Sequence, residues 1–270
     1  MASTSARDVR ATVDLMAVCL SRCLRDGERA FHGVVSTLPM VAVLLAQRTH
    51  APNLVYLNTG GSVDPLPGHL PASTSDPALF EGTPALFDVI DVFDLSARGG
   101  LDVVFHSGIQ IDRFGRINLS SLGGDYRHPK VRLPGGAGSA HLMPTAKRVI
   151  LWRTRHDRDT FVESVSFVTA SGNVDRVVTP LCVFRKSDGQ LELESIHPGV
   201  TFDDVQSATA WPLQEAPTTP APTQTELAAL EAVDPERIRD VEFGRSRRTL
   251  VSTAAITLPL FPEALPTDRP

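Results

Sequence analysis

A glycine-rich stretch, residues 110–143, holds the groups with the clearest chemical potential in this sequence. Gly115 and the pair Gly123-Gly124 interrupt its first half, and Pro134 opens the run Gly135-Gly136-Ala137-Gly138. Glycine adopts positive φ and lets another group approach the backbone closely. Bare N–H groups in such a loop can stabilise an anion or a developing oxyanion. A tight turn between a strand and a helix is the alternative, and composition alone favours it because glycine clusters are weakly specific.

Alternating helical and apolar segments must position this stretch. Helical spacing predicts helices over residues 12–25, 38–49 and 84–98, and short apolar runs predict strands over 29–35, 53–57 and 101–105. This order is typical of the α/β class, with an open, mostly parallel sheet flanked by helices. Loops that face a ligand are then expected at the carboxyl ends of the strands.

The second half of the chain continues the sheet and then changes character. Residues 147–152, 174–184 and 191–196 favour β structure, whereas residues 62–82 favour a loop. We predict one α/β domain over residues 1–212. Residues 213–270 then form a Pro-rich linker or strap, a short helix over 225–232 with Thr225 as N-cap, and a loosely held tail from Arg245.

Composition excludes several function classes. The chain has 270 residues, 42% of them hydrophobic, and a net charge of -5, so a basic nucleic-acid-binding face is not expected. No apolar run is long enough to span a membrane and no signal peptide opens the chain, so we expect a cytoplasmic protein. Cys19 and Cys23 share a helix face, but no companion ligands follow at a suitable spacing. Buried thiols are therefore expected rather than a metal site.

Several segments in order resemble a known family. Residues 110–118, 124–126 and 129–138, followed by 195–201, resemble the β subunits of class I CoA-transferases, with the glutaconate type the most similar. The chain also resembles the β subunits of acyl-CoA hydrolases that degrade steroid rings. The resemblance covers roughly residues 10–212.

The resemblance implies a partner, a substrate and a place for the active site. The partner is a related α subunit, in a heterodimer or an α2β2 assembly, and the site lies where the two chains meet. The substrate is an acyl-CoA thioester, so coenzyme A is part of the substrate and no cofactor is bound. Gly136, Ala137 and Gly138 match the segment whose N–H groups stabilise charge on the thioester oxygen, although the family often has a G-x-G-G pattern here.

Asn58 stands where the resemblance places the attacking glutamate of a transferase, directly after the strand over 53–57. An amide cannot form the acyl-glutamyl anhydride, but it can orient a carbonyl or a water by hydrogen bonding. Three alternatives follow. The chain serves hydrolysis, decarboxylation or another non-transferase step; it serves a true transferase whose nucleophile comes from elsewhere; or it is a non-catalytic structural subunit.

Five further residues are candidates for substrate binding. Gln110, expected to end a strand, and Gly60, in the turn after Asn58, are placed near the thioester. Lys130 and Arg132 suit CoA phosphates because basic groups bind phosphate well, with a solvated strand edge as the alternative. His141 either reaches the substrate or starts the next helix.

Overall fold

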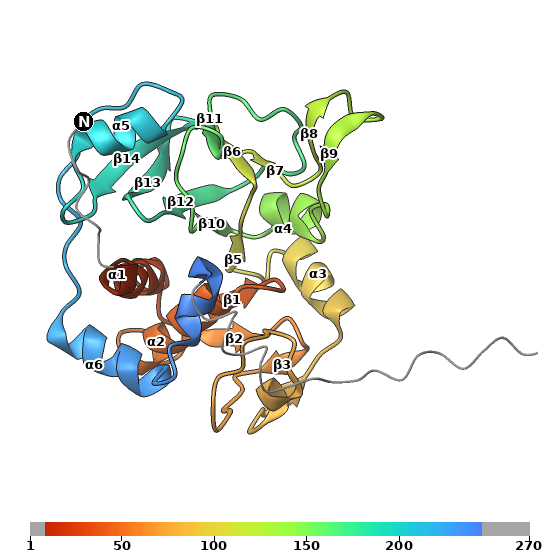
Figure 1. The fold of residues 1–270 in the computed structure, drawn as a ribbon. Coiled ribbons are helices and arrows are strands. Elements are labelled where there is room, and N and C mark those ends of the chain that lie inside the picture. Colours follow the sequence, from red (N-terminus) through yellow and green to blue (C-terminus); the bar gives the residue numbers. More distant parts are fainter. Residues whose placement is uncertain (1–8, 245–270) are drawn as a thin grey trace, which may run out of the picture.

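A nine-stranded sheet forms the centre of the molecule (Figure 1). The computed structural model describes residues 9–244. In sheet order the strands are β14 (Gln190–Ile196), β13 (Cys182–Ser187), β12 (Val174–Val178), β10 (Arg148–Trp152), β5 (Val103–His106), β1 (Arg29–His32), β2 (Val55–Leu57), β3 (Ser62–Val63) and β4 (Ala85–Leu86). The five strands from β12 to β2 are parallel, and the two outer pairs are antiparallel. The predicted fold class is confirmed.

Helices cover both faces of the sheet, each over its own apolar cluster. One face carries α1 (Val9–Arg22), α2 (Thr37–Arg48), α6 (Gln224–Val233) and the 3-10 helices η1 (Pro77–Phe80) and η2 (Ile238–Phe243). The other carries α3 (Val89–Ala97), α4 (Ser139–Thr145), α5 (Phe202–Ala208) and a small sheet of β11 (Phe161–Val162), β6 (Gln110–Asp112) and β7 (Ile117–Asn118). Successive strand residues therefore pack on different helices, since side chains alternate between the faces.

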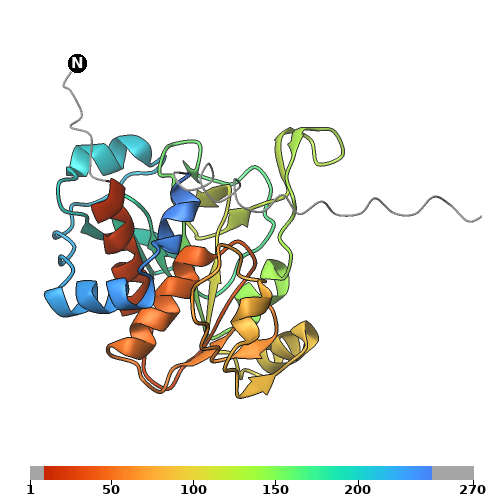
Figure 2. The ribbon, with the colours of Figure 1, turned by 60° about the horizontal axis from the view of Figure 1, so that its bottom comes forward.

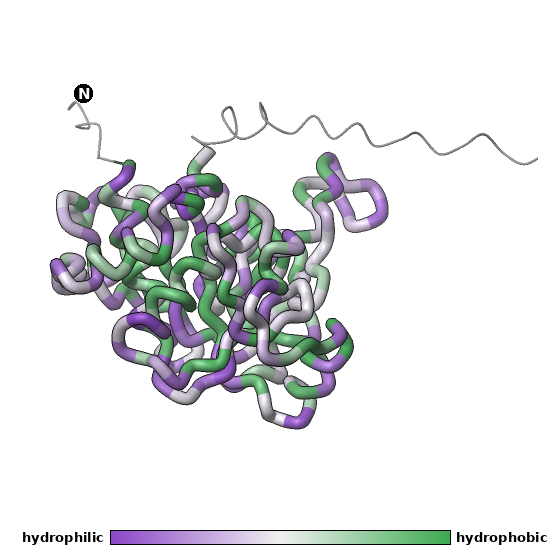
Figure 3. Tube along the Cα trace, turned by 90° about the horizontal axis from the view of Figure 1, so that it is seen from below, coloured by the Kyte–Doolittle hydropathy of each residue, from purple (hydrophilic) through white to green (hydrophobic). Residues whose placement is uncertain are grey.

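An antiparallel hairpin stands clear of this body. It consists of β8 (Ser121–Gly124) and β9 (Pro129–Arg132). Figure 2 shows the hairpin projecting beyond the sheet and its helices, and Figure 3 shows that its tip is largely hydrophilic. The turn between its two strands contacts the loop before β12, where the rings of Tyr126 and Phe167 stack with centroids 4.7 Å apart.

Several predicted boundaries need correction. The segment 84–98 is not one helix, because β4 pairs with β3 before α3 begins at Val89. The segment 174–184 is two antiparallel strands rather than one. The loop over 62–82 also contains β3 and η1. Short strands such as these are set by pairing partners elsewhere in the chain, which periodicity does not report.

The C-terminal part that is described returns to the first helices. Thr218 pairs with Ile196 beside the edge strand β14, and α6 and η2 then pack on α1 and α2. The N-cap of α6 is Thr223, whose hydroxyl accepts the N–H of Glu226, rather than the predicted Thr225. The predicted tail from residue 245 lies outside the described residues. No helix within residues 9–244 is long and apolar enough to cross a membrane.

Candidate active site

Asn58 is completely buried at the carboxyl end of β2. Its Nδ2 donates to the Tyr56 hydroxyl over 2.9 Å and to the Thr74 carbonyl oxygen over 3.2 Å. Its Oδ1 accepts the Gly60 N–H over 2.7 Å. Both ends of the amide are therefore engaged within this chain.

A buried polar chain continues from Asn58 to the neighbouring strand. The Tyr56 hydroxyl lies 2.6 Å from Nε2 of His32, which ends β1. The other ring nitrogen of His32 lies 3.0 Å from the Gly33 carbonyl oxygen. Burial lowers the pKa of His32 to about 4, so its ring is neutral near pH 7. These hydrogen-bonded side chains face α1 and α2, because Tyr56 belongs to the apolar cluster on that side of the sheet.

The glycine run offers backbone donors with no acceptor. Gly135 donates its N–H to the Leu119 carbonyl oxygen, but the N–H groups of Gly136, Ala137 and Gly138 have no partner among residues 9–244. Ala137 has φ of 43°, a left-handed conformation that is uncommon outside glycine. A Cβ on Gly136 would approach Ser139 Oγ and Thr169 Cγ2 to 2.5 Å. An alanine at this position would force one of these two side chains to move.

The run lies on the other face of the sheet but toward the same end as Asn58. A Cβ on Gly138 would meet the Phe93 ring of α3 at 2.7 Å, and Leu142 of α4 belongs to the second apolar cluster. The C-terminal end of α4 adjoins the start of β5, since Lys147 donates its N–H to the Leu101 carbonyl oxygen. Its N-terminal end therefore points toward the carboxyl ends of the parallel strands.

Gln110 begins β6 and does not end a strand, contrary to prediction. Its Oε1 accepts from Asn118 Nδ2 over 2.9 Å and from the Ser166 hydroxyl over 3.0 Å. These bonds tie β6 to β7 and to the loop after β11. The side-chain oxygen of Gln110 is therefore hydrogen-bonded within the fold.

Lys130 and Arg132 are exposed on the projecting hairpin. The Arg132 guanidinium lies 4.7 Å from the Tyr126 ring centroid and donates to the Tyr126 carbonyl oxygen over 2.7 Å. His141 is exposed on α4, where its Nε2 lies 3.1 Å from the Phe93 carbonyl oxygen. His141 thus bridges α4 to α3 beside the glycine run.

His106 is not among the residues that the sequence predicts for the site. It ends β5, the central strand, and its Nε2 is closed to solvent without a hydrogen-bond partner among the described residues. The hydroxyl of the next residue, Ser107, is also buried and has no hydrogen-bond partner among the described residues. The available signal was a histidine directly after an apolar run that predicts a parallel strand.

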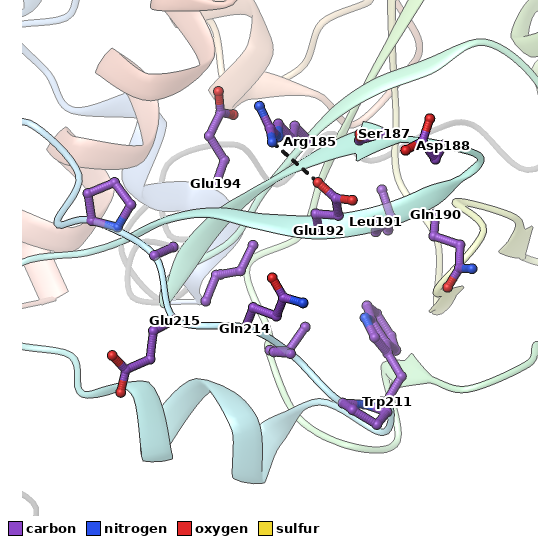
Figure 4. Close-up of a pocket in the computed structure, with 15 residues that line it drawn as sticks. Arg185, Ser187, Asp188, Gln190, Leu191, Glu192, Glu194, Trp211, Gln214 and Glu215 are labelled. Atoms are coloured by element: carbon purple, nitrogen blue, oxygen red, sulfur yellow. Dashed lines mark hydrogen bonds and ion pairs between the residues drawn. The ribbon is translucent and has the colours of Figure 1, made fainter.

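A pocket of about 600 Å³ lies away from these residues, between β14 and the following strap (Figure 4). Its walls carry Glu192, Glu194 and Glu215, and Arg185 in the same wall is paired with Glu192 over 3.3 Å. An acidic lining disfavours a phosphate-bearing ligand. The pocket is also at the sheet edge rather than at the carboxyl ends of β1, β2 and β5.

Cys19 and Cys182 are buried, and Cys23 is half-buried. Burial raises the pKa of both Cys19 and Cys23 to about 12, so neither is a thiolate near pH 7. Among residues 9–244, no cluster of His, Cys, Asp and Glu side chains could hold a metal ion.

Comparison with known proteins identifies the family. Residues 13–208 match the model of the coenzyme A transferase family. The B subunit of the 3-oxoadipate CoA-transferase of Pseudomonas knackmussii is 33% identical over 245 residues, which cover 83% of this chain and 93% of that protein. The cholesterol ring-cleaving hydrolase IpdB subunit of Mycobacterium tuberculosis is 31% identical over 251 residues, covering 85% and 97%. The decarboxylase AibA/AibB superposes with a TM-score of 0.79 at 30% identity, covering 85% of this chain and 97% of its own. The chain therefore belongs to the coenzyme A transferase family.

Proposed function

We propose that this chain is the β subunit of a heteromeric enzyme that transforms an acyl-CoA thioester without CoA transfer, by hydrolysis or a related step. The observation that carries the proposal is the state of Asn58. An uncharged amide stands where the family resemblance places the attacking carboxylate, and its hydrogen bonds are made inside the fold. It holds the turn after β2 and attacks nothing.

In this proposal, the glycine run polarises the thioester. The unpaired N–H groups of Gly136, Ala137 and Gly138 are fixed before the substrate arrives, so they stabilise negative charge on the thioester oxygen without reorganising. One such donor contributes about 3 kcal/mol to lowering a barrier. Hydrolysis and decarboxylation both develop negative charge at this oxygen, so one cradle suits either reaction.

The partner and the remaining ligand contacts follow from the relatives. The hydrolase and transferase relatives are named as subunits, and AibA/AibB is named as a pair. We place an α subunit opposite the carboxyl ends of the strands, in a heterodimer or an α2β2 assembly, as the source of the acting carboxylate. Lys130 and Arg132 meet the CoA phosphates, and Gln110, Gly60 and His141 line the acyl side. Coenzyme A arrives as part of the substrate, no other cofactor is needed, and the compartment is the cytoplasm.

A true CoA-transferase is the second candidate, favoured by the 33% identity to the B subunit of a 3-oxoadipate CoA-transferase. Its nucleophile would have to lie outside position 58.

Trapping during turnover separates the two. The chain, assembled with its partner, is incubated with acyl-CoA and then with borohydride or hydroxylamine, and both subunits are analysed by mass spectrometry. A transferase that keeps the glutamate serves as positive control. We expect no reduced or hydroxamate-modified carboxyl on this chain; a modified Asp or Glu here overturns the non-transferase proposal. Unchanged rates in both Asn58→Ala and Gly136→Ala would instead indicate a structural subunit.

A further inference from the structure

Four histidines of this chain are largely buried, and one of them differs from the rest. His32, His156 and His197 each have hydrogen-bond partners at both ring nitrogens. His106 has a partner at neither among residues 9–244, and its Nε2 is closed to solvent. An unpaired polar group in such a place destabilises the folded state, because it has lost its hydrogen bonds to water. Among the described residues, the fold therefore satisfies three of these imidazoles and leaves the fourth available to another group.

His106 lies at the same end of the sheet, and on the same face, as the glycine run. Its Cα pairs with Leu151 of β10, so it lies at the carboxyl end of the sheet between β1 and β10. Val104, two residues earlier, belongs to the apolar cluster that includes Leu142 of α4. Because strand side chains alternate, His106 is directed to that face as well. The N-terminal end of α4, with N–H groups that have no partner among residues 9–244, points toward this end of the same face.

We propose that His106 is a catalytic residue whose imidazole N–H donates a hydrogen bond to the acyl portion of the bound CoA thioester, beside the glycine run. This inference rests on the proposed function and adds a side-chain donor to it.

The chemistry of the ring suits a donor rather than a base. Burial lowers the pKa of His106 to about 4, so the ring is neutral near pH 7. A neutral imidazole donates through one nitrogen and accepts through the other. It can therefore stabilise an oxygen that gains negative charge while keeping its own proton, as a backbone N–H does. No proton has to leave the site in this role.

The test compares His106→Leu and His106→Gln in the assembled heteromer with a CoA thioester that the wild-type complex turns over. We expect kcat to fall about 100-fold in His106→Leu, with a smaller fall in His106→Gln, since the Gln amide can still donate. The melting temperature of His106→Leu should equal or exceed that of the wild type, because an unpaired polar group is removed. His197→Leu is the matched control and should melt lower, since it leaves the Thr179 carbonyl oxygen without its partner.

A spectroscopic measurement covers the case in which variants assemble poorly. With labelled histidine in the wild-type complex, the His106 resonances should shift when an uncleavable CoA thioether is added, and those of His197 should not. The inference is overturned if His106→Leu keeps the kcat of the wild type, or if it lowers the melting temperature as much as His197→Leu does. It is also overturned if the His106 resonances do not shift when the thioether is added. If Gly136→Ala lowers kcat while His106→Leu does not, only this inference fails. If the wild-type complex turns over no CoA thioester, the proposed function fails with it.

Discussion

Nδ2 of Asn58 donates a hydrogen bond to the hydroxyl of Tyr56 over 2.9 Å, so the residue after β2 is tied to the strand that presents it. Period-two alternation places both side chains on the α1–α2 side of the sheet. The position where the family resemblance expects a nucleophile is therefore part of the buried framework.

Asn58→Ala should destabilise the protein by about 2–3 kcal/mol, because it leaves the Thr74 carbonyl oxygen and the Gly60 N–H without their partner. Urea unfolding of the isolated chain measures this. Asn53→Ala is the control: its amide makes an exposed bond to Asp26, so a change of only about 0.5 kcal/mol is expected. Equal effects of the two substitutions would contradict the buried network.

Gly136→Ala should lower kcat of the complex about 100-fold with little change in KM. The new Cβ displaces Ser139 or Thr169 and with them the N–H groups that follow. The matched control is Gly68→Ala, where the added Cβ would lie 3.8 Å from the nearest atom, Glu81 Oε2. Steady-state measurements of kcat and KM for both variants test this prediction. If Gly136→Ala keeps the kcat of the wild type, the glycine run does not stabilise the oxyanion.

Replacing both Lys130 and Arg132 by alanine should raise KM for the CoA thioester about tenfold at low salt, equivalent to ~1.4 kcal/mol, and leave kcat unchanged. The reason is that both side chains are exposed on the hairpin, where they can meet phosphates but not the reacting carbonyl. The difference should shrink as salt rises. Arg98→Ala, which removes an exposed charge paired with Asp94 on α3, is the control and should not change KM.

Glu242 should make stability fall as pH rises. Its carboxylate accepts the Leu38 N–H over 2.9 Å and the Thr37 hydroxyl over 2.8 Å at the start of α2. Burial raises its pKa from 4.5 to about 7, with opposing contributions from these bonds and from Arg153. Between those values the folded state binds more protons than the unfolded state, so the free energy of unfolding decreases with pH.

The variant Glu242→Gln isolates this effect. Its free energy of unfolding, relative to the wild type, should grow by up to about 3 kcal/mol from pH 4.5 to 8. Urea melts at several pH values measure the difference. The buried histidines act in the opposite direction below pH 6.5, but they are common to both proteins and cancel. Parallel pH profiles for the two proteins would be incompatible with a buried Glu242 carboxylate.

Arg239 should be essential for stability. Its side chain is 1% exposed, and its guanidinium contacts Asp14 of α1 and the fully buried Asp234 after α6, each over 2.8 Å. Arg239→Ala leaves a buried carboxylate unpaired and should cost about 3–5 kcal/mol. Arg98→Ala breaks an exposed pair and should cost about 0.5 kcal/mol at most. Thermal unfolding compares the two variants. Similar melting temperatures would contradict a buried ion pair between Arg239 and Asp234.

The fold class, the family resemblance and the absence of a carboxylate at position 58 could all be predicted along the chain. The periodicity of residues 12–25 and 38–49, the apolar strands and the order of the glycine-rich segments are local properties, so they need no knowledge of tertiary contacts. Cys19 is buried as expected, whereas Cys23 is only half-buried.

Which side of the sheet each candidate faces, and which polar groups are already satisfied, became clear only from the folded chain. Asn58 turns to α1 and α2 while the glycine run lies over α3 and α4, because register and side-chain alternation fix these directions. His32 and His106 both end central strands, but they face opposite sides of the sheet, and only His32 has hydrogen-bond partners among the described residues. Hydrogen-bond satisfaction is a property of the packed chain, because the partners of a buried group come from segments distant in sequence.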